Sequence, residues 1–211
     1  MIAQLELTKH YSPEDYLELE INSESRHEYI DGEIVPMTGG MPNHNRIISN
    51  LCAALNFAFK RQPYEVFVTD QRVWIPRRRI YTYPDVFVVQ GDLQLQEGRK
   101  DTIVNPMIIF EVLSDSTRAY DKDGKFAAYR TIPSFQEYVL VDQYTVQVEH
   151  YYETEPSKWA FVDYDSPEAQ LSLATVSLEL SLADIYAKVV FEPDPQLTDD
   201  RGPSDEPTAN D

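Results

Sequence analysis

A glutamate in the middle of an apolar run constrains this chain more than any other feature. The segment IIFEVL, residues 108–113, has the length and composition of a buried strand, yet its fourth residue is Glu111. An ionised carboxylate inside a protein is costly unless it is paired or bound to a metal. We therefore expect the fold to bring a positive charge, either a basic side chain or a metal ion, next to Glu111.

A second acid precedes another apolar run. Asp85 follows Pro84 and stands immediately before VFVV, residues 86–89. If the two strands are neighbours in one sheet, Asp85 and Glu111 meet at one end of it, where their like charges repel and favour a bound cation. Oxygen ligands of this kind suit Mg²⁺, with Mn²⁺ as a substitute, so we predict a metal site at these two carboxylates. The alternative interpretation is that Asp85 is a turn residue.

A basic side chain follows on the next predicted helix. Asp121, Lys125 and Tyr129 recur every four residues and so share one helical face. If this helix packs back on the sheet, Lys125 can reach the carboxylates, orient an attacking water and offset charge on phosphorus. Asp121 is expected to cap or salt-bridge the helix, and Tyr129 to lie in the core rather than contact phosphate. Lys125 and Glu111 can alternatively form a structural ion pair without catalysis.

The pattern along the chain predicts an α/β (α+β) fold with a mixed central sheet flanked by helices, preceded by an N-terminal helix and hairpin. Ser12-Pro13 begins the first helix, and Asp31-Gly32 marks the hairpin turn. Later helices are predicted at residues 44–60, 122–130 and 181–189, and strands at 65–70, 72–76, 84–90, 107–113, 137–142, 145–152 and around 159. We expect one domain, residues 1–192, and a disordered acidic, Pro-rich tail, residues 193–211.

Composition narrows the function classes. The net charge of −18, still near −12 without the tail, counts against tight nucleic-acid binding unless a divalent metal supplies local positive charge. One cysteine and no apolar segment of membrane-spanning length predict a cytoplasmic protein without a membrane partner. No P-loop, nucleophile elbow, dinucleotide fingerprint or zinc spacing is present.

The order of these motifs resembles the PD-(D/E)XK nuclease superfamily and, more narrowly, the Uma-type restriction-endonuclease-like family. The resemblance spans about residues 12–190, and its motifs are the Pro-Asp pair 84–85, FEVLS 110–114, and the series Thr117, Asp121, Lys125 and Tyr129. It implies a restriction-endonuclease-like core, Mg²⁺-dependent hydrolysis of phosphodiester bonds with DNA as the expected substrate, and a homodimer.

One departure affects the predicted site. The superfamily pattern places lysine two residues after the acid, but position 113 is leucine. The resemblance implies that Lys125 takes the role of that lysine, so that Asp85, Glu111 and Lys125 form the catalytic set. It also implies that an acid or histidine from an early element can join the metal ligands. Glu33 and His44 are the candidates, although a solvated hairpin residue and a helix-terminal residue are the simpler interpretations, and Glu28 is a weaker candidate.

Two function hypotheses follow from these observations. The first is a metal-dependent endonuclease. The basic run PRRR, residues 76–79, is either a patch that binds the nucleic-acid backbone or only the exposed tip of a hairpin. The second is a catalytically inactive dimer that keeps the nuclease fold as a binding or regulatory module. The acidic surface expected from the composition and aromatic pairs such as Tyr151-Tyr152 motivate it.

Overall fold

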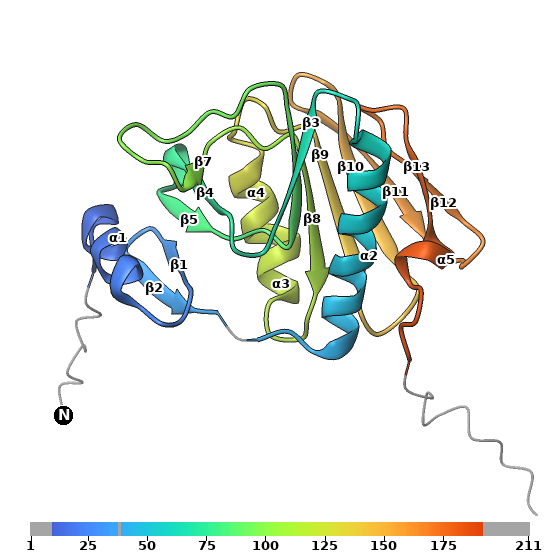
Figure 1. Ribbon diagram of the computed structural model, residues 1–211, viewed down its shortest axis with the longest axis horizontal. Helices are drawn as coiled ribbons and strands as arrows, with labels where there is room; N and C mark the ends of the chain where they lie inside the picture. Colours follow the sequence, from blue (N-terminus) through green and yellow to red (C-terminus); the bar gives the residue numbers. More distant parts are fainter. Residues whose placement is uncertain (1–9, 38, 192–211) are drawn as a thin grey trace, which may run out of the picture.

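The computed structural model describes residues 10–37 and 39–191, and its centre is a six-stranded mixed sheet (Figure 1). The strand order is β11-β10-β9-β8-β6-β3, with β8 and β9 parallel and the other neighbouring pairs antiparallel. The bounds of the strands are β3 Tyr64–Val68, β6 Val86–Gln90, β8 Ile108–Leu113, β9 Glu137–Asp142, β10 Val148–Glu155 and β11 Lys158–Tyr164.

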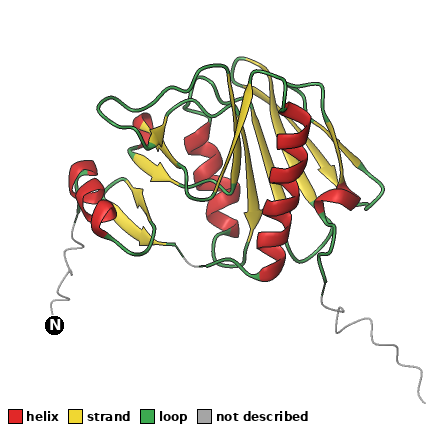
Figure 2. Cartoon of the chain, in the orientation of Figure 1, coloured by secondary structure: helices red, strands yellow, loops and turns green. Residues whose placement is uncertain are grey.

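Helical segments cover both faces of this sheet (Figure 2). On one face lies α2 (Pro42–Phe59), whose apolar side chains recur at helical spacing and pack with Val86, Val88, Ile108 and Phe110. On the other face lies a continuous helical segment made of α3 (Arg118–Tyr120), the π-helical turn η2 (Asp121–Lys125) and α4 (Phe126–Tyr129). Burial of apolar side chains on both faces explains why the central strands read as nearly continuous apolar runs.

A second sheet stands beside the first and carries the N-terminal elements. Its order is β2-β1-β5-β4-β7, and all its pairs are antiparallel except β4 with β7. The bounds are β1 His27–Ile30, β2 Glu33–Pro36, β4 Arg72–Ile75, β5 Ile80–Thr82 and β7 Thr102–Ile103. The hairpin between β1 and β2 turns at Asp31 and Gly32, whose φ angles of 43° and 109° explain the Asp-Gly pair.

The N-terminal helix α1 (Pro13–Asn22) packs on this second sheet through tyrosines. Ser12 caps the helix, since its hydroxyl accepts from the Asp15 N–H while the Asp15 carboxylate accepts from the Ser12 N–H. Tyr16 is fully buried against Tyr29 of β1 and Tyr81 of β5, with ring centroids 5.5 and 5.1 Å away. These aromatic contacts fix the position of β1, and therefore of its side chains, relative to the rest of the chain.

The remaining elements pack beside α2, on the same face of the six-stranded sheet. They are the two-stranded sheet of β12 (Gln170–Ser172) and β13 (Glu179–Ser181), followed by the short helix α5 (Leu182–Ile185). Apolar side chains from this region join the core under α2, including Leu171, Leu180 and Leu182. Within the described ranges, no helix combines the length and the apolar character needed to cross a membrane.

The predicted fold class is confirmed, with three differences in detail. The sheet is divided into two larger sheets rather than one, because β5 pairs with β1 and β4 instead of joining the central strands. The helix predicted at residues 122–130 begins earlier, at Arg118, and β7 lies between the strands predicted at residues 84–90 and 107–113, where no strand was predicted. The predicted boundary near residue 192 and the tail, residues 193–211, lie outside the described residues.

Candidate active site

Strand register brings Asp85 and Glu111 together. In the antiparallel pair β6–β8, Val86 lies opposite Phe110, so the residue before Val86 lies opposite the residue after Phe110. The Asp85 N–H points to Glu111 Oε2 at 3.3 Å, and Asp85 Oδ2 accepts from the Val112 N–H at 2.7 Å. The two carboxylates predicted to meet are therefore neighbours at one end of the central sheet.

Lys125 lies beside Glu111, as the helical spacing predicted. Its Nζ donates to Glu111 Oε1 at 3.2 Å, and the Tyr129 hydroxyl donates to the same oxygen at 2.8 Å. Asp121 Oδ1 lies 3.1 Å from Lys125 Nζ, which agrees with the predicted salt bridge within the helix. Tyr129 is fully buried, so it belongs to the core and also orients Glu111.

The π-helical turn η2 carries both Asp121 and Lys125 to the site. π-helical turns are rare and occur mostly as single turns inserted into α-helices, frequently at functional sites. Two contacts support this turn: the Tyr138 hydroxyl donates to the Asp121 carbonyl oxygen at 2.9 Å, and the Tyr120 ring packs over Gly124. A Cβ at Gly124 would lie only 2.5 Å from that ring, so the position requires glycine.

Glu28, the weakest of the early candidates, is the one that the structure brings to this cluster. Its Oε1 lies 3.5 Å from Lys125 Nζ and accepts from the Thr82 hydroxyl of β5. Glu33 is not brought there: it is exposed at the start of β2 and makes no ion pair or side-chain hydrogen bond with another described residue. Strand alternation does not distinguish the two acids, because Glu33 lies opposite Ile30 in the β1–β2 pair and so shares the face of Glu28. They differ in position across the sheet: β1 pairs with β5, whereas β2 is the edge strand.

His44 reaches the site from the first turn of α2. Its Nε2 lies 3.3 Å from Asp85 Oδ2, and the two side chains are only 15% and 16% exposed. Burial opposes the charged form of this imidazole, but the hydrogen bond and negative charge of Asp85 outweigh it and raise the pKa of His44. His44 Nδ1 is buried and has no hydrogen-bond partner.

The cluster holds more negative than positive charge. Glu28, Asp85, Glu111 and Asp121 supply four carboxylates around the single ammonium of Lys125. Burial, together with the neighbouring carboxylates, raises the pKa of Glu111 to about 8 although Lys125 acts in the opposite direction. Burial also opposes charge on Lys125, but the surrounding carboxylates outweigh it and raise the pKa of this lysine.

This donor set fits a hard divalent cation. Among residues 10–37 and 39–191, no three His, Cys, Asp or Glu side chains are grouped so that they could hold a metal ion. Mg²⁺ does not require such a group, because it is commonly bound by one or two carboxylates while waters and substrate phosphates fill its other positions. Asp85 and Glu111 are the adjacent carboxylates that would hold it, and the surplus negative charge around them favours a cation.

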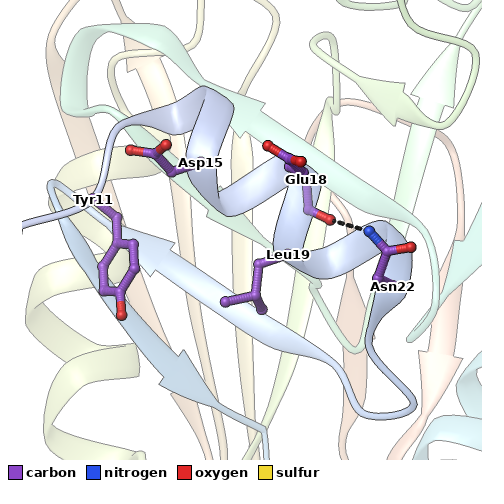
Figure 3. Close-up of a pocket in the computed structure, with 5 residues that line it drawn as sticks. All are labelled: Tyr11, Asp15, Glu18, Leu19 and Asn22. Carbon is purple, nitrogen blue, oxygen red and sulfur yellow. Dashed lines mark hydrogen bonds between the residues drawn. The ribbon is translucent and has the colours of Figure 1, made fainter.

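Other surface features do not join this cluster. A hollow of about 340 Å³ lies on α1 and is lined by Tyr11, Asp15, Glu18, Leu19 and Asn22 (Figure 3), none of which is a member of the carboxylate cluster. The basic run forms an exposed turn, η1 (Pro76–Arg78), between β4 and β5. Its last arginine, Arg79, has φ 53° and pairs with Asp31 at 3.1 Å, whereas Arg77 and Arg78 are exposed and form no ion pair with another described residue.

Comparison with known proteins places this site in context. Residues 13–184 match the model of the Uma2 family, described as "Putative restriction endonuclease". Two uncharacterised proteins of Synechocystis sp. are similar over most of their length. One is 36% identical over 171 residues, covering 81% of this chain and 97% of the relative, and the other is 34% identical over 182 residues, covering 85% and 93%.

A solved structure has the same fold. It is that of "a putative nuclease belonging to DUF820" from Anabaena variabilis, which aligns with a TM-score of 0.70 at 20% sequence identity and covers 85% of this chain and 99% of that one. The family match, over residues 13–184, covers most of the chain, and the chain therefore belongs to the Uma2 family.

Proposed function

We propose that this protein is a divalent-metal-dependent endonuclease that hydrolyses phosphodiester bonds of DNA. The observation that carries the proposal is the meeting of Asp85 and Glu111 across the β6–β8 register, with Lys125 at hydrogen-bond distance from Glu111. Two carboxylates and a lysine at one sheet end are the side chains that metal-assisted attack on a phosphodiester requires. Membership of a restriction-endonuclease-like family supports the same reaction class.

Each residue has a separate role in this proposal. Asp85 and Glu111 would hold Mg²⁺, or Mn²⁺ in its place; such an ion polarises a phosphoryl oxygen and lowers the pKa of a bound water. Lys125 places a fixed positive charge where a phosphate must bind and can orient the attacking water. Tyr129 holds Glu111 in place through its hydroxyl, and His44 does the same for Asp85.

An acidic protein needs a local source of attraction for a polyanion. The net charge of the chain is −18, and phosphate contacts normally supply most of the affinity for DNA. A bound cation supplies part of that attraction. The exposed arginines Arg77 and Arg78 of η1 supply a second part in this proposal, as contacts to the DNA backbone.

A cleavage assay tests the proposal. Supercoiled plasmid and single-stranded DNA are incubated with wild type and with Asp85→Asn, in Mg²⁺, Mn²⁺ or EDTA. Asp92→Asn is a matched control, since it makes the same change at an exposed aspartate just after β6. Cleavage by wild type and by the control, lost in Asp85→Asn and in EDTA, is the expected result. Equal cleavage by all three proteins, or none by any of them, contradicts the proposal.

One observation favours a second function. The ion pair between Lys125 and Glu111 is already closed and buried, as in a structural pair, and this suits a nuclease fold kept as a dimeric binding or regulatory module. That module predicts a homodimer in solution without metal-dependent cleavage. Light scattering after size-exclusion chromatography, together with the cleavage assay, separates the two: a dimer that neither binds Mn²⁺ nor cleaves any nucleic acid favours the module.

A further inference from the structure

Three carboxylates from three elements surround the Lys125 ammonium. Its Nζ lies 3.1 Å from Asp121 Oδ1 in η2, 3.2 Å from Glu111 Oε1 in β8 and 3.5 Å from Glu28 Oε1 in β1. An ammonium has three N–H donors. The contact with Glu111 is a hydrogen bond, and the contacts with Asp121 and Glu28 are ion pairs, so in this arrangement the three carboxylates hold Lys125 inside the protein.

The ion pairs of Lys125 are strong because Lys125, Glu111 and Asp121 are buried, and Glu28 is half-buried. Lys125 is 7% exposed, Glu111 3% and Asp121 2%. Charges in such a position interact strongly, and removal of one member of a buried set is costly because the others lose their partner. Lys125 can therefore leave a carboxylate only when another positive charge takes its place.

Glu111 is the carboxylate that two cations would share. Its Oε1 accepts from Lys125 and Tyr129, while its Oε2 faces the Asp85 N–H, on the side of the proposed metal ligand Asp85. A divalent ion bound to this carboxylate would withdraw negative charge from Lys125 and repel the ammonium directly. Occupation of the metal site and the bond between Lys125 and Glu111 therefore oppose each other.

We propose that Lys125 is a built-in counter-ion that competes with the divalent cation for Glu111, so that metal binding releases the lysine toward the substrate phosphate. The inference rests on the proposed metal-dependent function and adds a form of regulation to it. Without metal, the lysine is locked among carboxylates and the site is inert. With metal, the same lysine gains a free donor, so the two parts of the catalytic set become available together.

The test measures Mn²⁺ affinity by isothermal titration calorimetry in the absence of DNA. Lys125→Met removes the competing charge, so we expect it to bind Mn²⁺ about tenfold or more tightly than wild type. Lys122→Met is the matched control on the same turn, because Lys122 pairs with Glu149 outside the cluster, and its affinity should equal that of wild type. Lys125→Arg keeps the charge and should also bind like wild type.

Thermal unfolding gives a second readout if Lys125→Met folds poorly. The rise in Tm between EDTA and Mn²⁺ should be larger for Lys125→Met than for wild type, since the ion replaces the missing charge. Equal or weaker Mn²⁺ binding by Lys125→Met overturns the inference. If wild type binds Mn²⁺, Asp85→Asn does not, and Lys125→Met binds it no more tightly than wild type, the inference alone is overturned and the metal site stands. If wild type and all variants fail to bind Mn²⁺, both the inference and the proposed metal-dependent function are overturned.

Discussion

Replacing Glu111 with glutamine should remove a pH-dependent loss of stability from the metal-free protein. In the folded chain, burial and neighbouring carboxylates raise the pKa of Glu111 from 4.5 to about 8. A carboxyl group whose pKa is raised on folding contributes stability that is fully present below its unfolded pKa and is lost as pH rises through its folded pKa. Glutamine cannot ionise, so Glu111→Gln lacks this loss.

The magnitude follows from the two pKa values. Between pH 4.5 and pH 7, the free energy of unfolding of wild type should fall relative to Glu111→Gln by about 3 kcal/mol, because each pKa unit corresponds to about 1.36 kcal/mol. The relative loss should approach its limit above pH 8, where Glu111 is ionised in both states. This loss of unfolding free energy is expected only in the metal-free protein, since a bound cation stabilises the ionised carboxylate.

Urea unfolding followed by circular dichroism, in EDTA and at several pH values from 4.5 to 8.5, measures this difference. Glu137→Gln is a buried control of opposite sign: burial is outweighed by hydrogen bonds from His150, Thr175 and Ala174, which lower the pKa of Glu137. The stability that Glu137 contributes is present above pH 4.5 and is lost only as pH falls below that value, so wild type and Glu137→Gln should give nearly parallel stability curves between pH 4.5 and 8.5. Parallel stability curves for wild type and Glu111→Gln would refute the reasoning about the buried carboxylate.

Three further predictions concern the partners of the carboxylates. Tyr129→Phe should lose about 1–3 kcal/mol of stability and most of the DNA cleavage, because Glu111 loses its hydroxyl donor; unchanged urea unfolding and cleavage rate would contradict this. Mg²⁺ at about 100 times its Kd should stabilise wild type by about 2.7 kcal/mol and leave Asp85→Asn unchanged in calorimetric scans, whereas an equal rise in both would place the ion elsewhere. His44→Asn should destabilise the protein more at pH 6 than at pH 9. The raised pKa of His44 gives stability that is fully present below pH 6.5 and is lost as pH rises through the pKa of the folded state. A pH-independent difference in urea unfolding between the two proteins would argue against the pair with Asp85.

The central pair of the site could be predicted because local patterns determine it. Apolar runs identified β6 and β8 as central strands. Asp85 before β6 and Glu111 within β8 then lie close when the two strands are neighbours in the observed register. Lys125 followed from its four-residue spacing from Asp121 and Tyr129. These inferences need only the periodicity of single elements and one strand pairing.

The other features depend on contacts between distant segments. Glu28 reaches Lys125 because tyrosines hold β1 against β5, and no local pattern in the sequence indicates that packing. β5 spans only Ile80–Thr82, too short for a recognisable alternation, so the division into two sheets was not predicted. Contacts of Tyr120, Tyr138 and Gly124 fix the π-helical turn. Helical spacing in the sequence does not indicate these contacts.

A crystal grown with Mn²⁺ and measured for anomalous scattering is the most direct test of whether Asp85 and Glu111 form a metal site. The expected result is an anomalous peak between the two carboxylates, with Lys125 Nζ farther from Glu111 than the 3.2 Å of the metal-free arrangement. A crystal at saturating Mn²⁺ with no peak at these carboxylates, and with Lys125 still bound to Glu111, would contradict the metal site and the nuclease mechanism built on it.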